Sequence, residues 1–192
     1  MAKITDPKPD GPLAGFGWTR AAALAAIAAV AAYRIAPHLP NLTPVGAMFV
    51  LGGLYLGRNL AWMAAPFAGL LISDTVLNLA YDGHAIHPGR VVDYLAFLLI
   101  ALAARWAAEK PVAARVGVVV TAPVAFFLIS NLGVWAGGTM YPRTLAGLME
   151  CYTAALPFFR GTLYGDWAFA GLGMLALEGL KARETKAAYS LP

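Results

Sequence analysis

Charged residues are scarce in this sequence, and their scarcity decides the class of protein. Only 12% of the 192 residues are Asp, Glu, Lys or Arg, whereas 60% are hydrophobic. A typical soluble domain carries about 25% charged residues. A soluble domain of this length would need more polar surface than this composition supplies, so the sequence predicts an integral membrane protein.

Several chemical signatures are missing as well. The single cysteine cannot form an internal disulfide. The sequence contains no G-x-S-x-G, H-E-x-x-H or P-loop motif. It also lacks a basic run interleaved with aromatic residues, which nucleic-acid-binding proteins often have. No hydrolase or ATPase activity and no nucleic-acid partner is therefore predicted, and the chain is not expected to be an enzyme.

What the sequence does contain is a succession of apolar segments bounded by charged residues, proline or glycine. None of them alternates as a β-strand does. The segments predicted to cross the roughly 30 Å of membrane hydrocarbon are residues 18–36, 42–57, 60–81, 91–108, 116–138 and 162–180. The start of the sixth is open between residues 154 and 162. The prediction is an all-α transmembrane domain over residues 18–180, with tails at 1–17 and 181–192.

The positive charges indicate the orientation of these six spans. With the N-terminus in the cytoplasm, ten cations lie inside: Lys3, Lys8, Arg20, Arg58, Arg105, Lys110, Arg115, Lys181, Arg183 and Lys186. Four lie outside: Arg34, Arg90, Arg143 and Arg160. This positive-inside bias predicts that both termini are cytoplasmic, in a bacterial inner membrane. The alternative is a cleaved signal peptide at residues 20–32, but two acidic residues precede it and an odd number of spans fits the charges less well.

The polar residues of the spans gather toward their outer ends. A proton or ion pathway needs polar groups through the full membrane thickness, so this one-sided layer instead predicts a ligand pocket open to the outside. The residues predicted to bind the ligand are Asn41, Asp74, Asn78, His84, Asn131, Trp135, Cys151, Tyr152, Arg160 and Asp166. Residues 150–160 are expected in an outer loop that leads into the sixth span.

Each span residue of this pocket also has a simpler structural interpretation. Asp74 inside a span needs a partner, which is either a ligand or a neighbour such as Asn78 or an arginine. Asn131 suits a hydrogen bond between helices. Trp135 and Tyr152 suit an interfacial aromatic belt.

The histidines and the cysteine leave alternatives open too. His84 and His87 lie three residues apart in a loop and lack further clear ligands for zinc. Cys151 is either a small buried residue, a soft metal ligand or a reactive thiol. Its neighbour Glu150 does not make it a base–nucleophile pair, because adjacent residues of a helix point about 100° apart.

Small residues recur every four positions along the first span. Ala21, Ala25 and Ala29 form one row, and a second row lies beside it at positions 28, 32 and 36. Such rows allow another helix to approach closely. They predict either packing within the bundle or docking of a partner protein on Ala21, Ala25 and Ala29.

Six short spans with both termini inside, an alanine-spaced first span and an outward-facing pocket are together similar to the substrate-binding S-components of energy-coupling factor (ECF) vitamin transporters. The stretches "PHLPNLTPVGAMFVLGGLYLGR", "LLISDTVLN" and "CYTAALPFFRGTLYGD" are also similar to a related bacterial membrane family without an assigned function. The resemblance covers residues 18–180. It implies an S-component-like bundle, a ligand between the outer loops and helix ends, and docking of a coupling subunit with its ATPases on the alanine row.

The resemblance suggests ligands without fixing one. A cobalamin-binding group of S-components uses a cysteine thiolate as a cobalt ligand, so Cys151 is a candidate ligand to a cofactor metal, and a corrinoid is the leading guess. An aromatic-rich pocket would equally suit thiamine, a flavin or a queuosine-type base. Arg143 and Arg160 would then hold a carboxylate or phosphate.

Two other functions stay open at this point. The chain is alternatively a structural or assembly subunit of a larger membrane complex, or a membrane thiol enzyme that uses Cys151. The main prediction is a membrane protein, in contact with lipid, that binds a small vitamin or cofactor precursor for uptake.

Overall fold

The computed structural model describes residues 17–37, 42, 44–57, 59–81 and 90–189. These residues form α1 (Trp18–Ile35), α2 (Val45–Tyr55), the 3-10 helix η1 (Leu60–Met63), α3 (Ala64–Tyr81), α4 (Val91–Ala107), α5 (Val112–Gly137) and α6 (Leu145–Tyr189). No strand occurs in this described part of the chain. The all-α class predicted from the sequence is confirmed.

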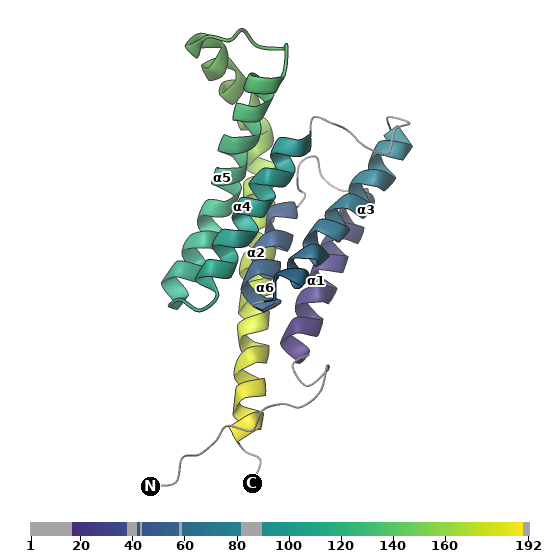
Figure 1. Ribbon diagram of the computed structural model, residues 1–192, viewed down its shortest axis with the longest axis vertical. Coiled ribbons are helices and arrows are strands. Elements are labelled where there is room, and N and C mark those ends of the chain that lie inside the picture. Colours follow the sequence, from purple (N-terminus) through teal and green to yellow (C-terminus); the bar gives the residue numbers. More distant parts are fainter. Residues whose placement is uncertain (1–16, 38–41, 43, 58, 82–89, 190–192) are drawn as a thin grey trace.

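Successive helices run in opposite directions along one axis (Figure 1). We call the end where α1 begins and α6 finishes the lower end, and the end where α1 finishes and α6 begins the upper end. At the lower end the Thr19 hydroxyl donates to Glu184 Oε2 over 2.6 Å and the Thr19 amide donates to Oε1 over 3.1 Å. The first and last helices are therefore tied together there.

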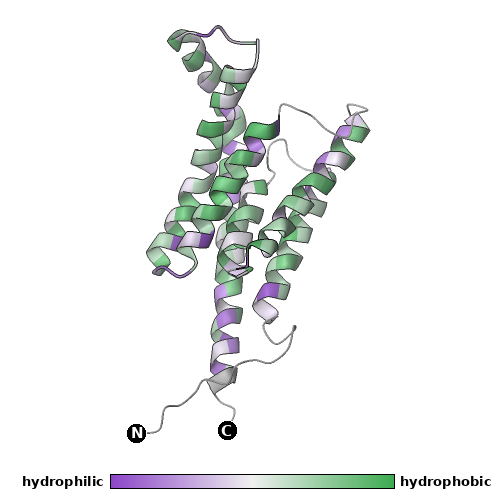
Figure 2. Ribbon diagram, viewed as in Figure 1, coloured by the Kyte–Doolittle hydropathy of each residue, from purple (hydrophilic) through white to green (hydrophobic). Residues whose placement is uncertain are grey.

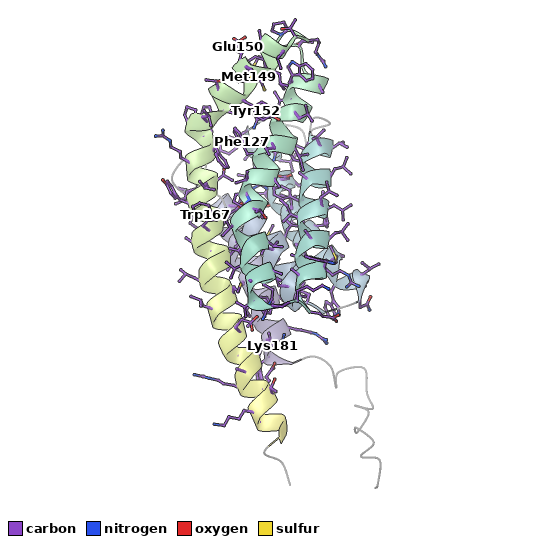
Figure 3. All side chains as sticks on the ribbon, turned by 90° about the vertical axis from the view of Figure 1, so that its left-hand side faces the viewer. Phe127, Met149, Glu150, Tyr152, Trp167 and Lys181 are labelled. Atoms are coloured by element: carbon purple, nitrogen blue, oxygen red, sulfur yellow. The ribbon has the colours of Figure 1, made fainter. Side chains whose placement is uncertain are left out.

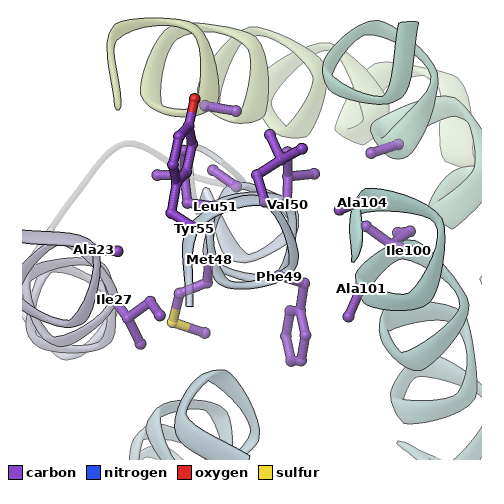
Figure 4. Close-up of a cluster of buried hydrophobic side chains, with 14 of the residues drawn as sticks. Ala23, Ile27, Met48, Phe49, Val50, Leu51, Tyr55, Ile100, Ala101 and Ala104 are labelled. Carbon is purple, nitrogen blue, oxygen red and sulfur yellow. The ribbon is translucent and has the colours of Figure 1, made fainter. Parts of the chain in front are cut away.

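Helix α2 lies at the centre of the bundle and is buried along its whole length. Its 11 residues are apolar on every side, which is typical of a helix enclosed by others. Met48, Phe49 and Leu51 point toward different neighbouring helices (Figure 4). The Phe49 ring stacks on Phe97 of α4 at 4.8 Å between ring centroids, and Phe97 stacks on Phe126 of α5 at 4.5 Å. At about 1.5 Å per residue, α2 is about 16 Å long, roughly half a membrane thickness.

The outer surface of the bundle is apolar, whereas polar residues gather toward its ends (Figure 2). Within the described part of the chain, two helical segments are long and apolar enough to cross a membrane: Leu60–Tyr81, which is η1 with α3, and Val112–Gly137, which is α5. Only 28% and 17% of their apolar windows are buried inside the protein. A core helix of a soluble protein would be mostly buried, so these exposed Leu, Ile and Val side chains need another apolar environment.

Helix α6 differs from the prediction for this part of the sequence. Its 45 residues begin at Leu145, so the segment expected as an outer loop at 150–160 is helical, as is most of the predicted C-terminal tail. Pro157 lies inside the helix, and a proline within a helix bends it without ending it. The upper part of α6 accordingly leans away from the axis of its lower part (Figure 3).

Candidate functional site

Asp74 is the centre of a buried polar network at the upper end. It lies on α3 and is 2% exposed. Its carboxylate forms ion pairs with Arg34 of α1 and with Arg90, the latter at 3.0 Å, and accepts a hydrogen bond from the Tyr94 hydroxyl over 2.7 Å. Arg34 also donates to the Ser73 hydroxyl over 2.8 Å. The tie of Asp74 to an arginine, one of the alternatives left open by the sequence, is present in the structure.

A cavity of about 250 Å³ adjoins this network. Its charged lining consists of Arg34, Asp74, Arg90, Asp93 and Asp166, and its remaining walls include the side chains of Tyr94, Phe97, Phe126 and Thr162. We call it the upper cavity. It brings five helices together, because α1, α3, α4, α5 and α6 all contribute side chains and Val45 and Gly46 close it from the first turn of α2.

Asp166 of α6 completes the beginning of α2. The Ala47 amide donates to Asp166 Oδ1 over 3.0 Å, and the Gly46 amide also faces the carboxylate. The first amides of a helix have no partner inside the helix and carry partial positive charge, so a carboxylate is favourable there. Among the described residues, Asp166 Oδ2 has no hydrogen-bond partner although the residue is only 2% exposed. This unsatisfied acceptor belongs to a residue that lines the upper cavity.

Four predicted pocket residues lie elsewhere, on α5 and the upper part of α6; Figure 3 labels one of them, Tyr152. Asn131 donates to the Phe127 carbonyl over 2.8 Å, and the Trp135 indole donates to the Pro142 carbonyl over 3.0 Å. The Tyr152 hydroxyl donates to the Leu128 carbonyl over 2.7 Å. These polar groups bond to backbone carbonyls of their own hairpin and none of them lines the upper cavity.

Cys151 belongs to the same hairpin. Its side chain is 2% exposed and its thiol lies 3.5 Å from the Asn131 carbonyl. Burial raises the pKa of the Cys151 thiol, and the neighbouring Trp135 amide works in the opposite direction. A buried thiol in its neutral form is a poor nucleophile and a poor metal ligand. Among the residues described, no group of three or more His, Cys, Asp or Glu side chains is placed so that it could hold a metal ion.

The remaining predicted residues are placed as follows. Asn78 is buried on α3, one turn beyond Asp74, and Arg160 is exposed on α6. Asn41 and His84 lie outside the described residues. Ala21 is half-buried, whereas Ala25 and Ala29 are exposed on the outer face of α1.

Sequence reasoning missed four of the charged and polar residues that line the upper cavity: Arg34, Arg90, Asp93 and Tyr94. A signal for two of them was present, since Arg34 and Arg90 stand at span ends next to the membrane and Asp74 needed a partner within reach. The pairing of Arg34 with Asp74 depends on α1 lying against α3, which no local pattern indicates.

A family model described as a family of unknown function (DUF6580) matches residues 17–188. The chain therefore belongs to this family. No curated protein and no solved structure matches it. The likeness to ECF S-components stays a prediction.

Proposed function

We propose that the protein is a six-span membrane protein of a bacterial inner membrane that binds a small water-soluble solute in the upper cavity and takes part in its uptake. The solute would be a vitamin or cofactor precursor, as in the S-components that the sequence resembles. The upper cavity would face the outside, and both termini the cytoplasm.

The apolar outer surface and the alternating helix directions support the six-span part of this proposal. The charges support its orientation. The described residues of the lower end include Arg20, Arg105, Lys110 and Lys181, and α6 adds Arg183 and Lys186 beyond them. More cations lie at the lower end than at the upper end, which is the expected distribution for a cytoplasmic lower end.

Asp166 is the observation that carries the solute-binding part. Leaving a buried acceptor without a partner costs about 1–3 kcal/mol, and more when the group is charged. Such a cost persists where function requires it. A solute that donates a hydrogen bond to Oδ2 would remove this free-energy cost on binding. A solute without a donor would not.

The lining of the upper cavity indicates what kind of solute fits. Counted as ionised, three carboxylates against two guanidinium groups give a formal excess of one negative charge, which favours a solute with a protonated amine or ring N–H. The rings of Phe97 and Phe126 and the phenol of Tyr94 offer faces for an aromatic or cationic group. A small heteroaromatic amine combines both properties.

The described residues of the upper cavity favour a solute smaller than a corrinoid. Pockets for drug-sized ligands occupy about 300–1,000 Å³, and the upper cavity is smaller, at about 250 Å³. Cys151, the proposed cobalt ligand, is buried between α5 and α6 and does not line this cavity. We therefore propose a solute smaller than a corrinoid.

The test is to purify the protein in mild detergent from its native host and identify co-purifying small molecules by mass spectrometry. Asp166→Asn keeps an oxygen for the Ala47 amide and replaces the unsatisfied acceptor with a donor. We expect wild-type protein to carry a small molecule at near-stoichiometric amounts, and Asp166→Asn to retain at most about one tenth of it, because a lost charged hydrogen bond is worth about 1.5–3 kcal/mol.

Glu150→Gln is the matched control, since it makes the same chemical change on the exposed surface of the same helix. It should retain the solute fully. Equal solute in wild type and Asp166→Asn, with both proteins folded, would refute the assignment of the site. A wild-type protein that is empty of small molecules but recovered with other subunits would favour the assembly function instead.

The exposed alanines of α1 favour that second function. The described residues leave Ala25 and Ala29 uncovered on the outer face of the bundle, and such a face accepts a closely packed helix. An assembly subunit predicts that Ala25→Leu with Ala29→Leu abolishes recovery of a partner, while Asp166→Asn has no effect on it.

A further inference from the structure

A second and larger cavity lies at the lower end of the bundle. Its volume is about 720 Å³, and it is enclosed by the C-terminal end of α2 together with α1, α4 and α6. We call it the lower cavity. Four cations line it, Arg20, Arg105, Lys110 and Lys181, against two carboxylates, Glu109 and Glu184, so its lining carries an excess charge of +2. Neither the family description nor the proposed solute site accounts for it.

Two arginines from different helices converge at one point of this cavity. The Arg105 side chain on α4 donates to the Gly57 carbonyl over 3.2 Å. Gly57 has a φ of 93°, which favours glycine, and a Cβ built there would lie 3.0 Å from Arg20 Nη2 of α1. Both guanidinium groups thus lie at the end of α2. The negative end of the helix dipole offsets only part of two positive charges.

The lining of the lower cavity holds fewer carboxylates than cations. Glu184 accepts two hydrogen bonds from Thr19, through the amide and the hydroxyl. Lys110 lies over the Trp106 ring, with its Nζ 5.3 Å from the ring centroid. Lys181 on α6 is exposed at the cavity wall. The cavity therefore presents guanidinium and ammonium donors from three sides.

We propose that the lower cavity binds a phosphate group, supplied by the headgroup of an anionic phospholipid or by a soluble phosphorylated molecule. Arginine and lysine are the usual phosphate-binding side chains. Basic cavities between transmembrane helices on the cytoplasmic side bind anionic lipid headgroups. The wall also includes Leu102 and Trp106, which are 41% and 64% exposed on the apolar outer face of α4. A headgroup in the cavity would leave its acyl chains beside this apolar face.

The test measures binding of phosphatidylglycerol to the whole protein in mixed detergent micelles, with the uncharged lipid diacylglycerol as reference. Native mass spectrometry reports the number of bound lipids. Lys181→Gln should weaken phosphatidylglycerol binding about fivefold, since one cation near an anionic lipid surface contributes roughly that factor. Lys186→Gln removes the same charge from the same helix, away from the cavity lining, and should change the affinity less than twofold.

A second variant changes the affinity in the opposite direction, which loss of folding cannot do. Glu109→Gln removes a carboxylate from the lining and should tighten binding about two- to fivefold. Raising the salt concentration from 50 to 500 mM should weaken binding by wild type more than by Lys181→Gln.

Two further probes identify the source of the phosphate. Glycerol 3-phosphate and inorganic phosphate are added to delipidated protein, and its thermal unfolding is followed. Binding of phosphatidylglycerol alone supports a lipid site, and stabilisation by the soluble phosphates that Lys181→Gln abolishes supports a soluble ligand. Equal affinities of Lys181→Gln and Lys186→Gln would overturn the proposal, because the lipid would then respond to the overall charge of the lower end. Absence of binding by every phosphate probe would also overturn it, and would leave the cavity to an acidic segment of a partner protein.

Discussion

The two ends of α2 adjoin cavities of opposite character. At its beginning, the upper cavity of about 250 Å³ has an acidic excess, and its central charge, Asp74, is buried and paired. At its end, the lower cavity of about 720 Å³ has a basic excess, and its lysine on α6 is exposed. In both places the neighbouring charges complement the helix dipole: Asp166 meets the amides at the start, and Arg105 meets the Gly57 carbonyl after the end.

The two ends are expected to differ in how much stability a single substitution removes. A buried charge cannot exchange its partner for water, so removal of one member leaves the other unpaired at high cost. An exposed charge is rehydrated and screened when its partner is lost. The upper end is therefore expected to respond steeply to single substitutions and the lower end weakly. The following predictions test that ordering, beginning with the largest effect.

Asp74→Ala should destabilise the protein most. It leaves Arg34, which is 9% exposed, without its carboxylate, and breaking a buried ion pair in this way costs about 3–5 kcal/mol. Unfolding of the detergent-solubilised protein, followed by denaturant titration, measures the change. Glu150→Ala serves as the exposed control and should change stability by less than about 0.5 kcal/mol. Similar losses in the two variants would remove the distinction between the buried and the exposed charges.

Gly53→Ala tests the packing of α2 between the two cavities. A Cβ at Gly53 would lie 2.5 Å from the Ala101 carbonyl oxygen and 2.6 Å from the Ala104 Cβ, so α2 and α4 would have to separate. Overpacking of this kind typically costs about 1–3 kcal/mol. Gly117→Ala is the matched control on α5, because nothing lies within 4 Å of its Cβ position.

The Gly117→Ala control should be neutral or stabilising by up to about 1 kcal/mol through helix propensity. A thermal unfolding series in one detergent compares the two variants. If Gly53→Ala were as stable as Gly117→Ala, the close approach of α2 and α4 would be wrong.

Cys151→Ala provides a reference that lies outside both cavities. It should cost about 1 kcal/mol, which is typical of a point substitution, and should leave the bound solute unchanged. Because burial and a raised pKa keep the thiol neutral, alkylation by N-ethylmaleimide at pH 7 should be at least tenfold faster after denaturation than before. Rapid alkylation of the folded protein, together with loss of the solute in Cys151→Ala, would instead show that Cys151 is part of the binding site.

Glu184 gives the smallest expected effect, at the lower end. The hydroxyl of Thr19, followed by lesser contributions, holds the pKa of Glu184 below its usual value. A carboxyl whose pKa is lowered by folding contributes stability above its unfolded pKa, and this contribution is lost as the pH falls through the folded pKa. Acid should therefore loosen the contact between α1 and α6.

Thr19→Val removes the hydroxyl and should reduce this pH dependence, at a cost of no more than about 1 kcal/mol at pH 7, since the group is partly solvated. Unfolding temperatures measured from pH 6 down to pH 3 compare the variant with wild type. Identical pH profiles would show that the Thr19–Glu184 contact does not stabilise the folded state.

The positions of most helices could be predicted from the sequence. The span predicted at 18–36 corresponds to α1, the span at 60–81 corresponds to η1 and α3, and the span at 91–108 corresponds to α4. These predictions were possible because proline, glycine and charged residues bound the apolar runs. The error was largest for α6, where the polar residues and Pro157 of the stretch from Met149 onward suggested a loop. A proline bends a long helix without ending it when the flanking residues are good helix formers.

The candidate site was predicted less well than the helices. Asp74 and Asp166, both predicted as pocket residues, line the same cavity. For Asp74 the prediction followed from the need of a carboxylate inside an apolar span for a partner. Asn131, Trp135, Cys151 and Tyr152 were grouped with them on depth alone, but these four residues belong to the hairpin of α5 and α6 and do not line that cavity. Depth in the membrane can be read from spacing along the chain, whereas the neighbours of each helix are set by packing over long sequence distances.

The most direct test of the account is an experimental structure of the wild-type protein purified from its native host, with the upper cavity inspected at Asp166. The account predicts density for a bound small molecule in the cavity, with a donor within about 3.2 Å of Asp166 Oδ2 and a ring beside Phe97 or Phe126. Density for a protein side chain that fills the cavity and donates to Oδ2 would contradict it, because the carboxylate would then be a purely structural cap of α2.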